Sequence, residues 1–133
     1  MKIDFFEIEN HGEFEKRVDR LVKKKHFKTL PLQIDELFNA FGKGEFEGDK
    51  IKSVKEPIAY DVYKLRLPNP DANVGKSGGY RVIYMVVTAV RIVVFLTIYY
   101  KKEEADVSDK YIDGLIDGFI LDMIPEHEEE ADE

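Results

Sequence analysis

The sequence contains no cysteine, only three scattered histidines and no long hydrophobic run, and each absence excludes a class of protein. Without cysteine there are no disulfides and no thiolate metal sites. His11, His26 and His127 lie far apart and belong to no motif, so no histidine cluster is expected. The longest apolar run, Ile92 to Ile98, is too short to cross a bilayer, and the first residues lack the layout of a signal peptide. We therefore expect a cytoplasmic protein without a membrane partner.

The charged residues are unevenly distributed along the chain. The net charge of −7 argues against a nucleic-acid partner, but six of the 27 acidic residues lie between Glu126 and Glu133. Between Val62 and Lys102 seven basic residues face one acidic residue, which gives this segment a charge of +6. A basic segment inside an acidic chain indicates a surface for polyanions, with chance clustering as the alternative.

Residue periodicity predicts a strand and two helices in the first third of the chain. Residues Lys2 to Glu9 alternate and are rich in aromatic side chains, as in a strand. Apolar residues then recur at helical spacing from Phe14 to about Phe27. A second helix is predicted after Pro31, with Gly42 at its end.

The second half of the chain predicts three strands and a helix. The strands are Tyr60 to Leu67, Tyr80 to Val87 and Arg91 to Tyr100, and a polar stretch with some extended structure precedes them. The loop PNPDANVGKSGG separates the first two strands, and a short turn makes the last two an antiparallel hairpin. Ser108 is expected to cap the final helix, which carries an apolar face.

This order of elements predicts an α+β domain. We expect a small antiparallel sheet with two N-terminal helices packed on one face, and a C-terminal helix. The other face of the sheet can then be open. The length suits one domain, residues 1–124, followed by a disordered acidic tail, residues 125–133.

Strand alternation sorts the basic residues by face. Leu65 and Leu67 point to one side of their strand, and Lys64 and Arg66 point to the other. If the polar faces of the three strands coincide, the basic residues converge on one patch. The alternative interpretation is that they are ordinary exposed side chains scattered over the sheet edges. The patch comprises Lys64, Arg66, Arg81, Tyr99 and Lys101.

Three motifs between residues 63 and 108 resemble the RelE/HigB branch of the RelE/ParE toxin superfamily. The first is a K-x-R strand, Lys64 to Arg66, and the second is G-K-S-G-G-x-R, Gly75 to Arg81. The third is I-Y-x-K, Ile98 to Lys101, followed by an acidic D-[IV]-S that opens a helix, Asp106 to Ser108.

The resemblance implies the toxin of a type II toxin–antitoxin module, acting as a ribosome-dependent mRNA interferase. The implied partners are the ribosome, mRNA and a cognate antitoxin of helix-turn-helix or ribbon-helix-helix type. Contact with DNA is expected only indirectly, through the antitoxin. The reaction is attack of a ribose 2′-hydroxyl on the adjacent phosphate. It needs a base, positive charge for the developing dianion and a proton for the leaving oxygen. Lysine, arginine and tyrosine can fill these roles, so no metal or other cofactor is expected.

The resemblance also suggests a role for each residue. Arg81 is expected to hold the scissile phosphate, Lys64 or Lys101 to take part in proton transfer, and Tyr99 to stack on a base or orient the substrate. The expected catalytic residues are Lys64, Arg81, Tyr99 and Lys101, and the expected RNA-binding residues are Arg66, Lys76 and Lys102.

Two other functions fit the same fold. One is a ParE-like inhibitor of DNA gyrase, which binds without catalysis, and the other is a plain RNA-binding domain. The full cationic set together with Tyr99 favours the nuclease.

Overall fold

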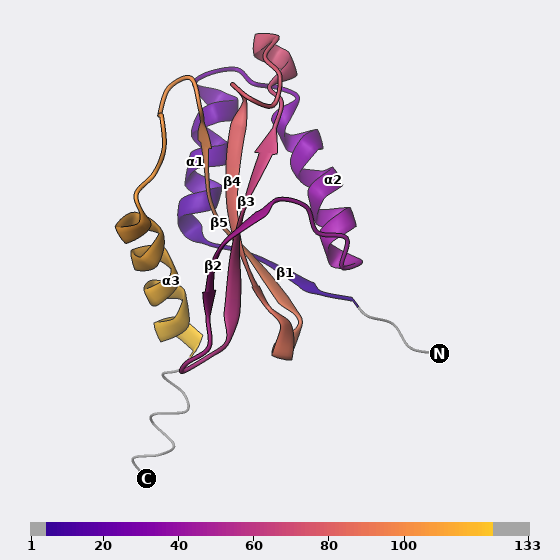
Figure 1. Ribbon diagram of the computed structural model, residues 1–133. Coiled ribbons are helices and arrows are strands. Elements are labelled where there is room, and N and C mark those ends of the chain that lie inside the picture. The colour runs from indigo at the N-terminus through magenta and orange to yellow at the C-terminus, as the bar shows by residue number, and fades with distance from the viewer. Residues whose placement is uncertain (1–4, 124–133) are drawn as a thin grey trace.

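The computed structural model describes residues 5–123, which form a five-stranded sheet with helices on both faces (Figure 1). The elements are β1 (Glu7–Asn10), α1 (Gly12–Lys23), α2 (Leu30–Gly42), β2 (Asp49–Val54), β3 (Tyr60–Leu67), β4 (Tyr80–Val87), β5 (Ile92–Tyr100) and α3 (Asp109–Met123). The predicted acidic tail and the start of the first predicted strand lie outside the described residues. Within residues 5–123, no helix combines the length and the apolar character needed to cross a membrane.

The strands are arranged in the order β1-β5-β4-β3-β2. Strands β2 to β5 are antiparallel, which confirms the predicted hairpin and the antiparallel core of the sheet. Strand β1 adds a parallel edge, because Glu7–Asn10 pair with residues 92–95 of β5. The sheet is therefore mixed. A hairpin imposes antiparallel pairing, but β1 is separated from the other strands by two helices and is free of that constraint.

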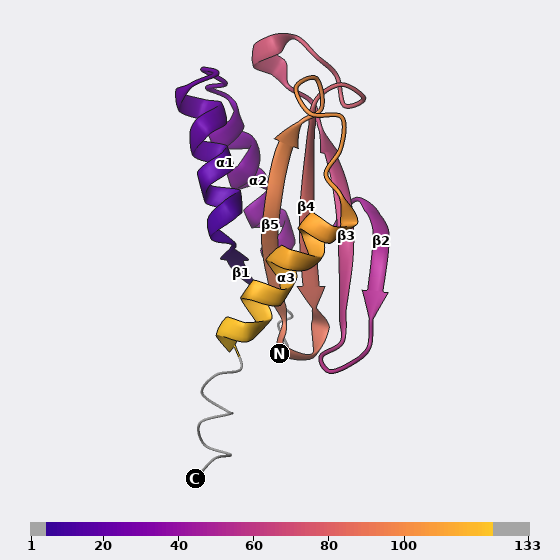
Figure 2. The same cartoon turned by 90° about the vertical axis from the view of Figure 1, so that its left-hand side faces the viewer.

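Helices α1 and α2 cover one face of the sheet, as predicted (Figure 2). Phe14 of α1 and Phe41 of α2 are buried against Tyr84 and Phe95, with 4.8 Å between the ring centroids of Phe41 and Tyr84. Each such ring contributes about 2 to 3 kcal/mol when it is buried. Helix α1 ends at Lys23, earlier than predicted, because His26 adopts a left-handed φ of 63° and turns the chain toward α2.

Helix α3 covers part of the opposite face, which sequence reasoning had left open. Ile112 and Ile116 are buried against Val62, Met85 and neighbouring residues of the sheet. An amphipathic helix has to bury its apolar stripe, and this face of the sheet offers the matching surface. The backbone N–H of Tyr111 donates to the Ser108 Oγ at 3.0 Å, which confirms the predicted cap.

Candidate nucleic-acid interface

Three residues of the predicted patch form a row across the sheet. Arg66 of β3 is paired with Arg81 of β4, and Arg81 is paired with Tyr99 of β5. Residues directly opposite one another in antiparallel strands point to the same face, with Cα atoms about 4.5 to 5.5 Å apart. Lys64 precedes Arg66 by two residues, and Lys101 follows Tyr99 by two. Asp106 links Lys64 to Tyr99, and Lys101 lies just beyond β5, where its backbone N–H donates to the Gly79 carbonyl at 2.8 Å. We call these five residues the basic patch: Lys64, Arg66, Arg81, Tyr99 and Lys101.

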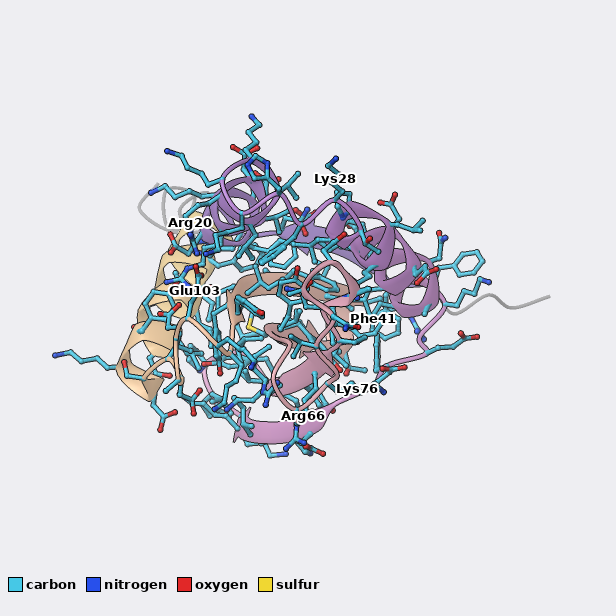
Figure 3. All side chains as sticks on the ribbon, turned by 90° about the horizontal axis from the view of Figure 1, so that it is seen from above. Arg20, Lys28, Phe41, Arg66, Lys76 and Glu103 are labelled. Carbon is cyan, nitrogen blue, oxygen red and sulfur yellow. The ribbon has the colours of Figure 1, made fainter. Side chains whose placement is uncertain are left out.

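Arg81 is buried, with only 7% of its surface exposed. Its Nη1 donates to the carbonyls of Lys76 at 2.9 Å and Tyr80 at 3.3 Å, and its Nη2 donates to the carbonyl of Ser77 at 3.0 Å. Two of its five N–H groups therefore hold the glycine-rich loop, a third bonds the start of β4, and two are not used in these bonds. Lys76 itself is exposed on that loop and lies on the same side of the molecule as Arg66 (Figure 3).

The loop between β3 and β4 is attached to α2 as well as to Arg81. The Asp71 carboxylate accepts from the backbone N–H of Thr29 at 2.8 Å and from its hydroxyl at 3.0 Å. Gln33 donates to the carbonyl of Pro68 at 2.9 Å. Part of the loop, Pro70–Ala72, forms one turn of 3-10 helix where no regular element was predicted. The position of Lys76 is therefore set by the packing of the loop.

Tyr99 is buried beneath α3, and its hydroxyl donates to Asp106 Oδ1 at 2.5 Å. Burial raises the pKa of Tyr99, and the bond to the Asp106 carboxylate raises it further. The same bond is the largest cause of the lowered pKa of Asp106. Tyr99 is thus a neutral hydrogen-bond donor at physiological pH. Because its ring is covered, Tyr99 cannot stack on a base, which corrects one of the two roles expected for it.

Asp106 is a residue of the site that sequence reasoning did not include. Its Oδ1 also lies 3.3 Å from the Nζ of Lys64 and accepts from the backbone N–H of Val107 at 3.0 Å. The sequence offered one signal, the acidic D-V-S before α3, but this had been interpreted as a helix start only. The bond from Tyr99 depends on how the chain returns from β5 to α3, which local patterns do not specify.

The two lysines after β5 have different surroundings. The Nζ of Lys101 donates to the carbonyl of Ala105 at 2.6 Å, across the turn that follows the strand. Lys102 is exposed, and its aliphatic stem lies close to Gly78, where a Cβ would be 3.3 Å from the Lys102 Cε. Lys102 therefore lies beside the glycine-rich loop. Arg91, by contrast, follows the turn between β4 and β5 and stacks on Phe6, so the +6 segment does not form one surface.

Residues 101–107, which we call the strap, connect β5 to α3 and carry three acidic side chains. Glu103 is paired with Arg20 at 2.8 Å and with Lys25 at 2.9 Å, and Glu104 is paired with Arg17 at 2.9 Å. Figure 3 shows the pairing of Glu103 with Arg20 on the flank of the molecule. Two acids of the strap thus pair with basic residues of α1 and of the turn after it, and Asp106 is the acid of the strap that is bonded to the basic patch.

The basic patch offers hydrogen-bond donors and positive charge, the chemistry that recognises phosphate. In the part of the chain that the structure describes, no three His, Asp or Glu side chains are arranged to hold a metal ion.

No family model matches the sequence, and no curated protein is similar to it. Among solved structures, the chain is similar to the archaeal RelE–RelB complex from Pyrococcus horikoshii OT3, with 18% sequence identity and a TM-score of 0.43. The match covers 73% of this chain and 96% of that chain.

Proposed function

We propose that this chain is the toxin of a toxin–antitoxin module and an mRNA endoribonuclease that works without a metal. The observation that carries the proposal is the row of Arg66, Arg81 and Tyr99 across three strands, flanked by Lys64 and Lys101. Cleavage by a 2′-hydroxyl needs positive charge at the phosphate and groups that move protons. The row and its two lysines offer both within one end of the sheet.

Each residue then has a role that follows from its exposure. Arg66 is exposed and makes the first contact with the phosphate, while the two remaining N–H groups of Arg81 support it from below. Tyr99 stays protonated, because its pKa is raised, and donates a hydrogen bond to a phosphate oxygen. Proton transfer falls to Lys64 or Lys101.

The RNA backbone extends past the reacting phosphate to the glycine-rich loop. Lys76 is exposed on this loop and Lys102 is exposed next to Gly78, and both contact neighbouring phosphates. Contacts of this kind release counterions, so the affinity for single-stranded RNA falls with salt with a slope of about −0.7 for each phosphate contacted.

The proposal extends to the partners of the protein. It includes action on ribosome-bound mRNA in the cytoplasm and neutralisation by a cognate antitoxin of the helix-turn-helix or ribbon-helix-helix type. These points, and the HigB branch within the family, rest on the resemblance of the motifs between residues 63 and 108.

The proposal is tested by mapping RNA ends. Purified ribosomes programmed with mRNA are incubated with the protein, and fragments with a new 5′-hydroxyl end are sequenced. Arg66→Ala should reduce cleavage about 100-fold or more, since removal of one donor that stabilises developing charge has an effect of this size. Lys28→Ala, an exposed lysine on the helix side of the molecule (Figure 3), is the control and should cut normally. If the unmodified protein produces no such ends, the enzyme assignment is wrong.

A plain RNA-binding domain is the second candidate, and one observation favours it. Arg81 uses most of its guanidinium on backbone carbonyls, as an arginine with a structural role does. The same experiment separates the two candidates, because a binding domain retains the RNA and leaves it uncut.

A further inference from the structure

Three donors converge on a single oxygen atom at the edge of the basic patch. Asp106 Oδ1 accepts from the Tyr99 hydroxyl at 2.5 Å and from the Val107 N–H at 3.0 Å, and the Lys64 Nζ lies 3.3 Å away. A hydroxyl, an ammonium group and a backbone amide around one oxygen form the kind of environment in which proteins bind oxyanions. The carboxylate therefore marks a position that favours an anionic oxygen.

The donors from the sheet and the carboxylate differ in how firmly they are held. Tyr99 is 2% exposed and packed under α3, and Lys64 projects from the paired strand β3. The side chain of Asp106 is 56% exposed and belongs to the strap, which has no regular secondary structure. Tyr99 is thus held by the core and Lys64 is anchored on a paired strand, whereas a surface segment presents the oxygen they bind.

We propose that the Tyr99 hydroxyl and the Lys64 ammonium group form a binding position for one phosphate oxygen of RNA, which Asp106 fills as an internal competitor in the free protein. The identity of the ligand as RNA rests on the proposed function, but the preference for phosphate rests on the donors alone. When phosphate enters, it replaces one anionic oxygen by another, so both donors keep a partner. The sheet need not change, and only the Asp106 side chain has to leave.

A positioning role for Asp106 makes the opposite prediction. If the carboxylate served to hold Tyr99 and Lys64 in place for the ligand, its removal would weaken binding. The sign of the effect of one substitution therefore separates the two roles.

The experiment is a titration with inorganic phosphate, followed by the backbone amide signals of Val107 and Tyr99 in NMR spectra. Asp106→Asn keeps an oxygen that can accept from Tyr99 and removes the charge. Asp109→Asn is the matched control, because it removes the same charge three residues later, from a carboxylate that bonds neither Tyr99 nor Lys64.

Asp106→Asn should bind phosphate about five- to tenfold more tightly than Asp109→Asn. The reason is that the ion pair with Lys64 and the charge-assisted hydrogen bond from Tyr99 no longer compete with phosphate for these two donors. Replacing Lys64 by methionine in the Asp106→Asn variant should abolish the gain. Equal or weaker binding by Asp106→Asn overturns the proposal.

A short RNA with 2′-O-methyl riboses, which the 2′-hydroxyl mechanism cannot cut, gives the second arm of the test. The affinities of the variants for this RNA should rank in the same order as their affinities for phosphate. If the ranking is not the same with RNA, the position binds free phosphate only, and the assignment of RNA as the ligand is overturned. Neither titration depends on cleavage. If Asp106→Asn binds more tightly but the protein produces no new 5′-hydroxyl ends, only the proposed nuclease activity is rejected. If the protein cleaves RNA but Asp106→Asn does not bind more tightly, only the competitor role of Asp106 is rejected.

Discussion

Gly79 is the residue of the glycine-rich loop whose substitution should be most harmful to the fold. A Cβ at this position would lie 2.1 Å from the carbonyl oxygen of Leu67, 2.9 Å from that of Gly75 and 3.0 Å from the Cα of Pro68. All three are backbone atoms, so no side chain can rotate away to make room. The Gly79 carbonyl also accepts from the N–H of Lys101 at 2.8 Å, which restrains it from the other side.

The cost of Gly79→Ala follows from these contacts. The loop or the end of β3 has to move by about 1 Å to restore an ordinary contact distance, a strain typical of overpacking. We expect a loss of about 3 kcal/mol in the free energy of unfolding, which places it among the more harmful substitutions. For a chain of this length the melting temperature should fall by about 10 °C.

The measurement is thermal and urea unfolding followed by circular dichroism. Gly75→Ala is the matched control, because a Cβ at Gly75 meets nothing within 4 Å. It should change the free energy of unfolding by less than about 0.5 kcal/mol. If Gly79→Ala is as stable as Gly75→Ala, the close approach of the loop to β3 is wrong.

Three further predictions concern the basic patch, the strap and the glycine-rich loop. Arg81→Lys keeps the charge but loses the planar guanidinium group that bonds the carbonyls of the loop. Amide hydrogen exchange in the loop should therefore accelerate, and the free energy of unfolding should fall by about 1 to 2 kcal/mol. The pKa of Asp106 is lowered in the folded protein, so its stabilising contribution is present above about pH 4 and lost as the pH falls through the folded value. The difference in unfolding free energy between the unmodified protein and Asp106→Asn should therefore shrink below that pH, and a constant difference would contradict the bond to Tyr99. Lys76→Ala and Lys102→Ala should each reduce the salt slope of RNA binding by about 0.7 without changing the melting temperature, and an unchanged slope would place the RNA elsewhere.

Residues close together in the sequence were placed correctly without the structure. The three central strands have the predicted bounds within one residue, because β-branched and aromatic runs and their flanking turn residues act locally. The faces of Lys64, Arg66 and Tyr99 also followed from the sequence, since alternation along a strand is a property of the backbone itself.

Other features depended on contacts between distant residues. The polar stretch before β3 contains an edge strand, β2, whose exposed residues gave no clear alternation. Strand β1 is parallel to β5, and α3 covers a face that was left open. In each case the partner lies far away along the chain, and local propensity does not specify a distant partner.

The sequence by itself determined which residues face the same side of each strand, and so identified the basic patch as a candidate. Only the tertiary structure decided what surrounds these residues. Arg81 holds loop carbonyls, and Asp106 meets Tyr99 and Lys64, because the loop before β4 and the strap after β5 both return to the same end of the sheet. The physical reason is that side-chain alternation is set by neighbouring peptide units, whereas hydrogen-bond partners are set by the path of the whole chain.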